Sequence, residues 1–210
     1  MLSFKTYSHQ KITSPKKLFI FIHGFNANGQ DLLSLAPYLQ DSLDDCLFLS
    51  PDAPNINHTM DNSFYWYNVG NLEPDYLAAE LKTILPAFSK YIEELKELYN
   101  VSNKDIYLYG FSQGALLTLH YGLAQTEAFA GLIAHSGGFI PGAFINRNIN
   151  KSEVCLIHGR DDMVIPYEFS QNAADFFNEK NIPNQLHIID NLDHSINPLS
   201  IDLTNKFLAS

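Results

Sequence analysis

The chain has 210 residues, 46% of them hydrophobic and 17% charged, so it can bury a sizeable core. Its formal net charge of −10 repels nucleic-acid phosphates, which argues against a nucleic-acid-binding protein. No apolar run reaches the roughly 18–20 residues of a membrane span, so we expect no stable membrane insertion. The N-terminal segment lacks a signal-peptide core, and Cys46 and Cys155 lie in apolar runs typical of buried free thiols. We therefore expect a cytoplasmic protein.

Strand-like and helical segments alternate along the sequence. Apolar runs predict strands at 18–22, 46–50, 106–109, 131–135, 153–158 and 185–189, and residues 2–7 predict an edge strand. Apolar spacing predicts helices at 31–40, 75–100, 113–124, 167–180 and 198–208. Asp31 is the expected N-cap of the first helix, and Pro86 predicts a kink or two abutting helices in the second. The alternation predicts an α/β fold with a mostly parallel, doubly wound sheet and helices on both faces.

We find no internal repeat or linker that would divide the chain, so we expect one domain over residues 1–210 without a large separate lid domain. Residues 51–74 lack helical periodicity and form the longest connection. A loop this long in a compact domain is usually functional or disordered. The aromatic residues 64–67 favour an ordered loop, because such side chains need a surface to pack on.

One short motif dominates the sequence, Gly110-Phe-Ser-Gln-Gly114, which lies between an apolar strand and a helix. A G-x-S-x-G turn in this context holds its serine in a strained conformation, and the glycines let strand and helix approach closely. Ser112 would then project from the end of the sheet. The helix N-terminus beneath it would offer free N–H groups to an oxyanion.

A nucleophilic serine needs a base and an acid that orients the base, and in this arrangement both follow the serine along the chain. His194 is the only histidine in the final turn. Four acids lie at downstream strand ends, namely Asp161, Asp162, Asp190 and Asp193. Asp193 is poorly placed because it is the immediate neighbour of His194, and the pattern alone does not choose among the others.

Several blocks together resemble the phospholipase/carboxylesterase family of small α/β-hydrolases, which includes acyl-protein thioesterases. They are Gly110-Phe-Ser-Gln-Gly114, His23-Gly24, Ser50-Pro-Asp-Ala-Pro54, His158-Gly-Arg-Asp-Asp162 and Asp193-His194-Ser195, in the family's order. The resemblance implies that Ser112 is the nucleophile, Asp162 the acid and His194 the base. It also implies that the main-chain N–H groups of Phe25 and Gln113 bind the oxyanion, and it places the family's aromatic loop residue at Trp66.

The resemblance implies hydrolysis of carboxylic esters or thioesters, small or acylated, by a monomer or homodimer without a cofactor. The spacing of histidines and acids shows no metal-ligand pattern. Apolar side chains in strand-end loops are candidates for an acyl pocket, namely Phe25, Phe64, Trp66, Tyr67, Phe139 and Val164. His23 is a further candidate, as a brace for the oxyanion loop. His135 and His158 end strands, and we interpret both as structural hydrogen-bonding groups.

Two other interpretations stay open at this point. One is an α/β-hydrolase of different specificity, such as a lactone hydrolase or a peptidase. The other is a ligand-binding member of the fold without catalysis, which an intact set of Ser112, Asp162 and His194 argues against.

Overall fold

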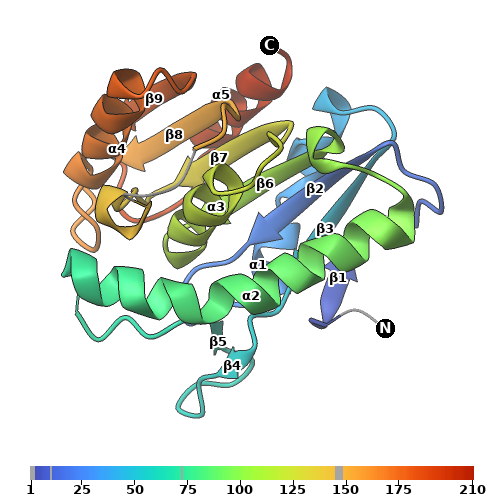
Figure 1. Cartoon of the computed structure of the whole chain (residues 1–210), viewed down its shortest axis with the longest axis horizontal. Coiled ribbons are helices and arrows are strands. Elements are labelled where there is room, and N and C mark those ends of the chain that lie inside the picture. The colour runs from blue at the N-terminus through green and yellow to red at the C-terminus, as the bar shows by residue number, and fades with distance from the viewer. Residues whose placement is uncertain (1–2, 10, 72, 145–148) are drawn as a thin grey trace.

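The computed structural model describes residues 3–9, 11–71, 73–144 and 149–210. A seven-stranded sheet runs through its centre in the order β1-β3-β2-β6-β7-β8-β9 (Figure 1). Its strands are β1 (Thr6–Ser8), β2 (Lys17–Ile22), β3 (Cys46–Pro51), β6 (Ile106–Phe111), β7 (Gly131–His135), β8 (Val154–Gly159) and β9 (Asn184–Ile189). Among the described residues of this sheet, β1 pairs with β3 in the antiparallel sense, and the other pairs are parallel. The predicted α/β-hydrolase architecture is confirmed.

Alternating side chains of the buried strands supply two separate cores. On β2, Leu18 and Ile20 belong to one apolar cluster, while Phe19 and Phe21 belong to the other. Successive strand residues point to opposite faces, so a continuous apolar run requires cover on both sides. The apolar run predicted at 18–22 therefore has the burial that its composition demanded.

The helices provide that cover. The face formed by α2 (Pro74–Tyr99), α3 (Gln113–Leu123) and α4 (Glu168–Glu179) lies toward the viewer in Figure 1. The short α1 (Gly29–Leu33) and the C-terminal α5 (Pro198–Leu208) cover the opposite face. All parallel strands end at the same edge of the sheet. Loops that follow the strands therefore meet there.

The helix predicted at 31–40 is shorter and begins earlier than expected. Its N-cap is Asn28, whose side chain accepts hydrogen bonds from the Gln30 and Asp31 N–H groups. Asp31 is the third helical residue and completes a capping box instead of starting the helix. After Leu33 the chain continues in short 3₁₀ turns, the first of which contains Pro37. Proline has no N–H to donate, which disfavours a continuous α-helix across this segment.

Pro86 lies inside α2 without dividing it. Residues Pro74–Tyr99 form one helix, so the alternative of two abutting helices is wrong, and the ribbon bends along its length in Figure 1. Burial explains this tolerance. One face of α2 packs into the core through side chains that include Leu81, Phe88 and Leu95, and this packing outweighs the loss of one helical hydrogen bond.

The long connection at 51–74 contains a two-stranded ribbon, β4 (Asn55–Ile56) and β5 (Phe64–Tyr65), which projects below the sheet in Figure 1. Trp66 and Tyr67 follow the ribbon and are almost completely buried. The expectation of an ordered loop is therefore correct for its described residues.

Candidate active site

The turn between β6 and α3 has the strained geometry that the motif predicts. Ser112 adopts φ 54° and ψ −116°, a combination that residues other than glycine rarely occupy. Gly110 and Gly114 permit it, because a Cβ at Gly110 would lie 2.2 Å from the Gly114 carbonyl oxygen. The Ser112 N–H donates to the His135 carbonyl at 2.9 Å, which ties the turn to β7. The Ser112 side chain is thereby held at the C-terminal edge of the sheet.

The structure brings three of the predicted site residues into one hydrogen-bonded row. His194 Nε2 lies 3.0 Å from Ser112 Oγ, and His194 Nδ1 lies 2.6 Å from Asp162 Oδ2. Because an ionised carboxylate only accepts, Nδ1 carries the proton toward Asp162, and Nε2 accepts the Ser112 hydroxyl proton. The His194 ring packs against Phe111, with 5.0 Å between ring centroids.

The carboxylate of Asp162 is enclosed and fully bonded. Its Oδ1 accepts the N–H groups of Val164 and Ile165 at 2.9 and 2.8 Å, and its side chain is inaccessible to solvent. Burial by itself would raise the pKa of Asp162, but the hydrogen bonds from His194, Ile165 and Val164 outweigh it and hold the pKa below its ordinary value. The carboxylate is thus ionised and fixed in orientation at neutral pH.

Two main-chain N–H groups border this row. Gln113 is the first residue of α3 and follows Ser112 directly, and Phe25 lies in the loop after β2. The loops are close, because a Cβ at Gly24 would lie 3.3 Å from the Ser112 Cβ. Within the described residues, neither the Phe25 nor the Gln113 N–H has a protein acceptor. Both can therefore donate to a negatively charged oxygen beside Ser112.

His23 fixes the loop that carries Phe25. Its Nδ1–H donates to the Gly24 carbonyl at 2.7 Å, and its Nε2 accepts the Ala53 N–H at 3.0 Å. Burial lowers the pKa of His23, so the ring is neutral and its tautomer is set by these two bonds. The indole N–H of Trp66 donates to the His23 carbonyl at 2.8 Å. His23 and Trp66 support the loop and do not line the pocket.

Gln113 also holds the aromatic loop against α3 through its side chain. Its Oε1 accepts the Trp66 N–H at 2.8 Å, and its Nε2 donates to the Tyr67 carbonyl at 2.6 Å. The Tyr67 hydroxyl in turn donates to the Gln113 carbonyl at 3.2 Å. This buried amide thus pairs with the loop backbone much as a neighbouring strand would.

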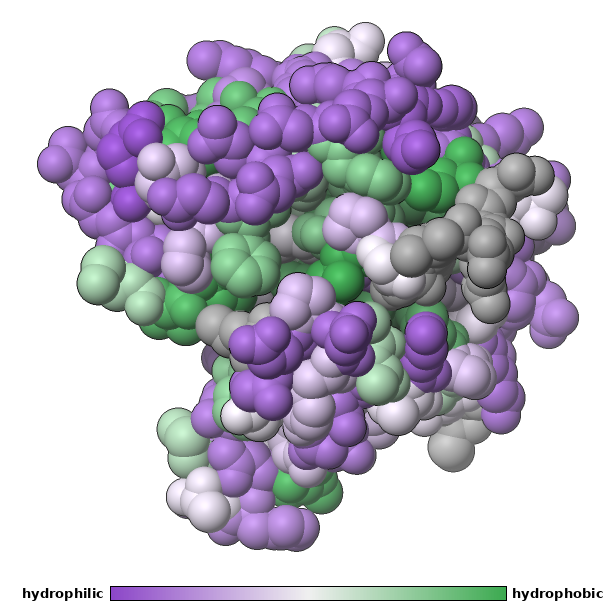
Figure 2. Space-filling view, turned by 60° about the vertical axis from the view of Figure 1, so that its left-hand side comes forward, coloured by the Kyte–Doolittle hydropathy of each residue, from purple (hydrophilic) through white to green (hydrophobic). Residues whose placement is uncertain are grey.

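An apolar pocket of about 160 Å³ opens beside Ser112, far more than the roughly 10–15 Å³ that one water requires. Its lining comes from the loops and from three helices, and comprises Phe25, Tyr67, Val69, Leu77, Ser112, Gln113, Leu116, Val164, Ile165 and Phe169. Figure 2 shows apolar side chains gathered in a hollow on this side of the molecule, with polar residues around it. The pocket suits a hydrocarbon group attached to a reacting carbonyl.

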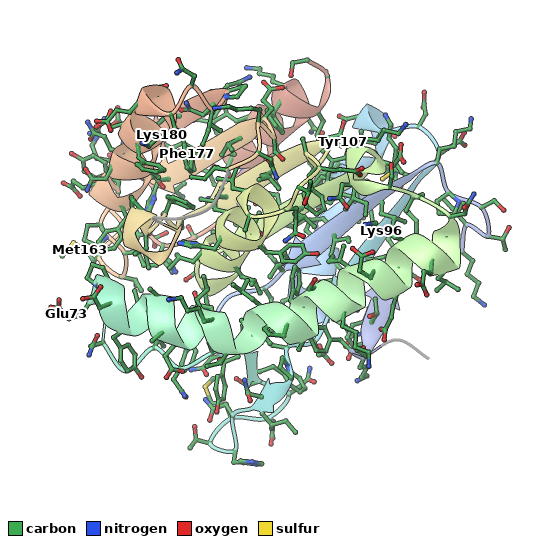
Figure 3. The ribbon with its side chains drawn as sticks, in the orientation of Figure 1. Glu73, Lys96, Tyr107, Met163, Phe177 and Lys180 are labelled. Atoms are coloured by element: carbon green, nitrogen blue, oxygen red, sulfur yellow. The ribbon has the colours of Figure 1, made fainter. Side chains whose placement is uncertain are left out.

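The sequence identified only part of this lining. Of the candidates for an acyl pocket, Phe25, Tyr67 and Val164 line this pocket, but Phe139 does not. Its ring stacks on His120 and Phe176, so it belongs to the core beneath α4. Phe64 packs against the same core cluster without lining the pocket. Met163, by contrast, is 93% exposed and points outward in Figure 3.

Sequence reasoning missed Leu77 and Leu116, which lie near the N-terminal ends of α2 and α3. Their helical spacing indicated only a core position. The signal that could have found them is their place in the first turns of helices that begin at the edge where the strands end.

Two further histidines, His120 and His135, and both cysteines are buried in the core. His120 bonds to the Leu116 carbonyl and the Ile140 N–H, and His135 to the Tyr109 hydroxyl. Cys46 and Cys155 are buried free thiols, and burial raises the pKa of each to about 12. Among the residues described, no three His, Cys, Asp or Glu side chains converge as metal ligands. The same residues contain no helix with the length and hydropathy of a membrane span.

Sheet topology, the strained serine turn and the histidine beside it define the α/β-hydrolase class. Residues 8–210 match the phospholipase/carboxylesterase family. The chain is 28% identical over 217 residues to acyl-protein thioesterase 1 homolog 1 of Dictyostelium discoideum, with 97% of this chain and 94% of that protein covered. It is 27% identical to acyl-protein thioesterase 1 of Emericella nidulans, with 90% and 87% covered.

Solved structures agree with this assignment. The esterase PE8 superposes with a TM-score of 0.90 at 28% identity, covering 99% of this chain and 97% of that one. A phospholipase/carboxylesterase from Dyadobacter fermentans shares the fold, with a TM-score of 0.78 at 23% identity and coverage of 100% and 98%. The chain belongs to the phospholipase/carboxylesterase family.

Proposed function

We propose that this hydrolase cleaves carboxylic esters and thioesters through an acyl-enzyme intermediate on Ser112, with His194 as the base and Asp162 as the acid. The observation that carries the proposal is the imidazole of His194, bonded at 3.0 Å to the serine hydroxyl and at 2.6 Å to a buried carboxylate. Esterases and acyl-protein thioesterases among the relatives support the same chemistry.

In the first half-reaction, Ser112 Oγ attacks the carbonyl carbon as its proton passes to His194 Nε2. The tetrahedral intermediate collapses when the imidazolium returns this proton to the leaving alcohol or thiol. In the second half-reaction, water attacks the acyl-serine and gives a proton to His194. That proton returns to Ser112 as the carboxylic acid leaves. Asp162 keeps the imidazole in one tautomer and stabilises its charged form.

We assign the N–H groups of Phe25 and Gln113 to the oxyanion that forms twice in this cycle. Both belong to backbone segments held rigidly, one by His23 and the other by the start of α3. Donors that are already oriented need no rearrangement when the charge develops, and one such donor contributes about 3 kcal/mol.

The acyl group would occupy the apolar pocket beside Ser112. We test this with p-nitrophenyl acetate, butyrate, octanoate and laurate, and expect kcat/KM to be larger for octanoate than for acetate. A sharp preference for acetate would contradict the assignment of the pocket. Absence of hydrolysis with every ester and with an acyl thioester would contradict the proposed activity as a whole.

Two substitutions in α2 provide a matched comparison. Leu77 lines the pocket, whereas Leu98 is 60% exposed on the same helix. Leu77→Phe should reduce kcat/KM for octanoate more than for acetate, because the larger ring fills space that the longer chain needs. Leu98→Phe should leave the ratio unchanged. If the ratio of kcat/KM for octanoate to kcat/KM for acetate were the same in both variants, the acyl chain would not occupy the space beside Leu77.

A further inference from the structure

The catalytic role proposed for Asp162 rests on its bond to His194, yet a second histidine bonds to the same oxygen. His158 Nε2 lies 3.1 Å from Asp162 Oδ2, the atom that His194 Nδ1 approaches at 2.6 Å. Neither the His158 nor the Asp162 side chain is accessible to solvent. His158 is the penultimate residue of β8, and Asp162 follows it four residues later, so the short turn after the strand sets their separation.

The proton positions on His158 follow from its neighbours. Nε2 faces two groups that only accept, the Asp162 carboxylate and the Ile165 carbonyl at 2.9 Å, so Nε2 must carry a hydrogen. Nδ1 lies 2.7 Å from the hydroxyl of Ser170 in α4, and that hydroxyl also lies 2.7 Å from the Gly137 carbonyl. A neutral His158 therefore donates from Nε2, and its unprotonated Nδ1 shares the single Ser170 hydroxyl hydrogen with the Gly137 carbonyl, to which Ser170 donates.

This arrangement repeats the order of the proposed catalytic row. Ser112, His194 and Asp162 form one arm, and Ser170, His158 and Asp162 form another, with both imidazoles donating to one carboxylate oxygen. Ser170 is completely buried, so the second arm has no access to substrate. Its effect is confined to the carboxylate that the two arms share.

We propose that His158 is a positioning residue, whose Nε2–H fixes the Asp162 carboxylate and shares its negative charge with the His194 N–H. The inference rests on the proposed function of Asp162 and His194. A donor on Oδ2 reduces the charge available to stabilise a protonated His194. His158 thereby limits how strongly Asp162 stabilises the imidazolium that forms at His194 during catalysis.

Few other groups near the two arms can titrate in the relevant range. From β7, His135 is buried, and burial lowers its pKa to about 3. Behind it on β6, burial raises the pKa of Tyr109. Asp193 precedes His194 and accepts the Ser195 hydroxyl. Arg160, after β8, pairs with Asp190 at the surface.

The test replaces the donor and follows His194 directly. We expect His158→Phe to raise the pH midpoint of the His194 imidazole by roughly 0.5–1 unit, because Asp162 then directs its full charge to one ring. The midpoint is measured by NMR in protein labelled at histidine, which requires no turnover. It therefore remains informative even if the ester-hydrolase proposal fails.

Kinetics give the second readout, from kcat and KM for p-nitrophenyl butyrate between pH 5 and pH 9. The acid limb of kcat/KM should move upward with the NMR midpoint, and kcat should fall by roughly 10-fold while KM changes little. Ser170→Ala keeps the Nε2 donor but removes the partner of Nδ1, so it should cause a smaller shift in the same direction. The Ser170→Ala variant also tests the proposal if His158→Phe does not fold.

His120→Phe is the matched control, because it replaces another buried histidine whose ring nitrogens bond to the backbone of Leu116 and Ile140. It should lower stability without moving the His194 midpoint. An unchanged midpoint and acid limb in folded His158→Phe would overturn the proposal, as would an equal shift in the control. If His158→Phe does not fold, an unchanged midpoint in Ser170→Ala has the same meaning.

Discussion

Replacing Gly114 by alanine tests whether the close approach of α3 to β2 holds the site together. A Cβ at this position would lie 1.9 Å from the Ile22 carbonyl oxygen and 2.7 Å from the His23 carbonyl oxygen. Ordinary contacts begin near 3.4 Å, so α3 and the end of β2 must separate by about 1.5 Å. Both obstacles are backbone atoms, which cannot rotate away as a side chain can.

The separation acts on the two proposed oxyanion donors, because Gln113 begins α3 and Phe25 follows β2. A misplacement of about 1 Å in a reacting geometry can cost on the order of 100-fold in rate, so we expect kcat to fall by at least that factor. Overpacking should lower the free energy of unfolding by about 1–3 kcal/mol. This exceeds the gain of up to about 1 kcal/mol from placing alanine in a helix.

Ester hydrolysis and urea unfolding measure the two effects of Gly114→Ala. Gly142→Ala is the control, because a Cβ there would meet nothing within 4 Å. The control should keep wild-type kcat and change the free energy of unfolding by less than about 0.5 kcal/mol. If Gly114→Ala kept wild-type kcat and stability, the claim that this contact sets the site geometry would be refuted.

Three further predictions follow from the same contacts. Asp162→Asn should reduce kcat by roughly 10³–10⁴-fold in steady-state assays with little change in folding, since the amide favours the wrong tautomer of the base; a smaller loss than 10-fold would contradict its role. Gln113→Ala removes the two side-chain hydrogen bonds to the Trp66 N–H and the Tyr67 carbonyl, so it should lower the melting temperature and raise KM for octanoate. An unchanged KM would mean that the loop holds its position without these hydrogen bonds. Stability should also decrease as the pH falls from about 6.5 to 4, because burial lowers the pKa of His120 to about 4 and that of His135 to about 3 while the unfolded chain takes up these protons near pH 6.5. The loss from His120 is about 3 kcal/mol at pH 4, and urea unfolding of His120→Phe at pH 7 and pH 4.5 should show a weaker dependence than the wild type.

The sheet and the serine turn could be predicted from sequence because each depends on local pattern. The apolar run at 18–22 demands burial on both faces, and the glycines around Ser112 permit the close approach of strand and helix that a tight turn requires. The start of α1 depended on tertiary contacts instead. The Gly29 N–H donates to Asp52 at 2.9 Å, across 23 positions, and helps to fix the helix start next to Asn28. Asn28 and Asp31 are both competent caps, so local preference could not choose between them.

The residues that line the pocket were also only partly predictable from local sequence pattern. Location in strand-end loops suggested Tyr67 and Val164, which line the apolar pocket beside Ser112, but it also suggested Phe139, which packs against Phe176 of α4. Apolar residues of a core and of an acyl pocket have the same chemistry. Only the three-dimensional packing separates them. The choice of Asp162 over Asp161 likewise came from resemblance, since adjacent acids in one turn have no distinguishing pattern.

The most direct measurement of the central claim is the site of covalent labelling by a fluorophosphonate, determined by mass spectrometry of the intact protein and its peptides. We predict one adduct per chain, located on Ser112, with no adduct in Ser112→Ala and much slower labelling in His194→Ala. Equal labelling of Ser112→Ala, or a wild-type protein that forms no adduct while remaining folded, would contradict a mechanism based on this serine.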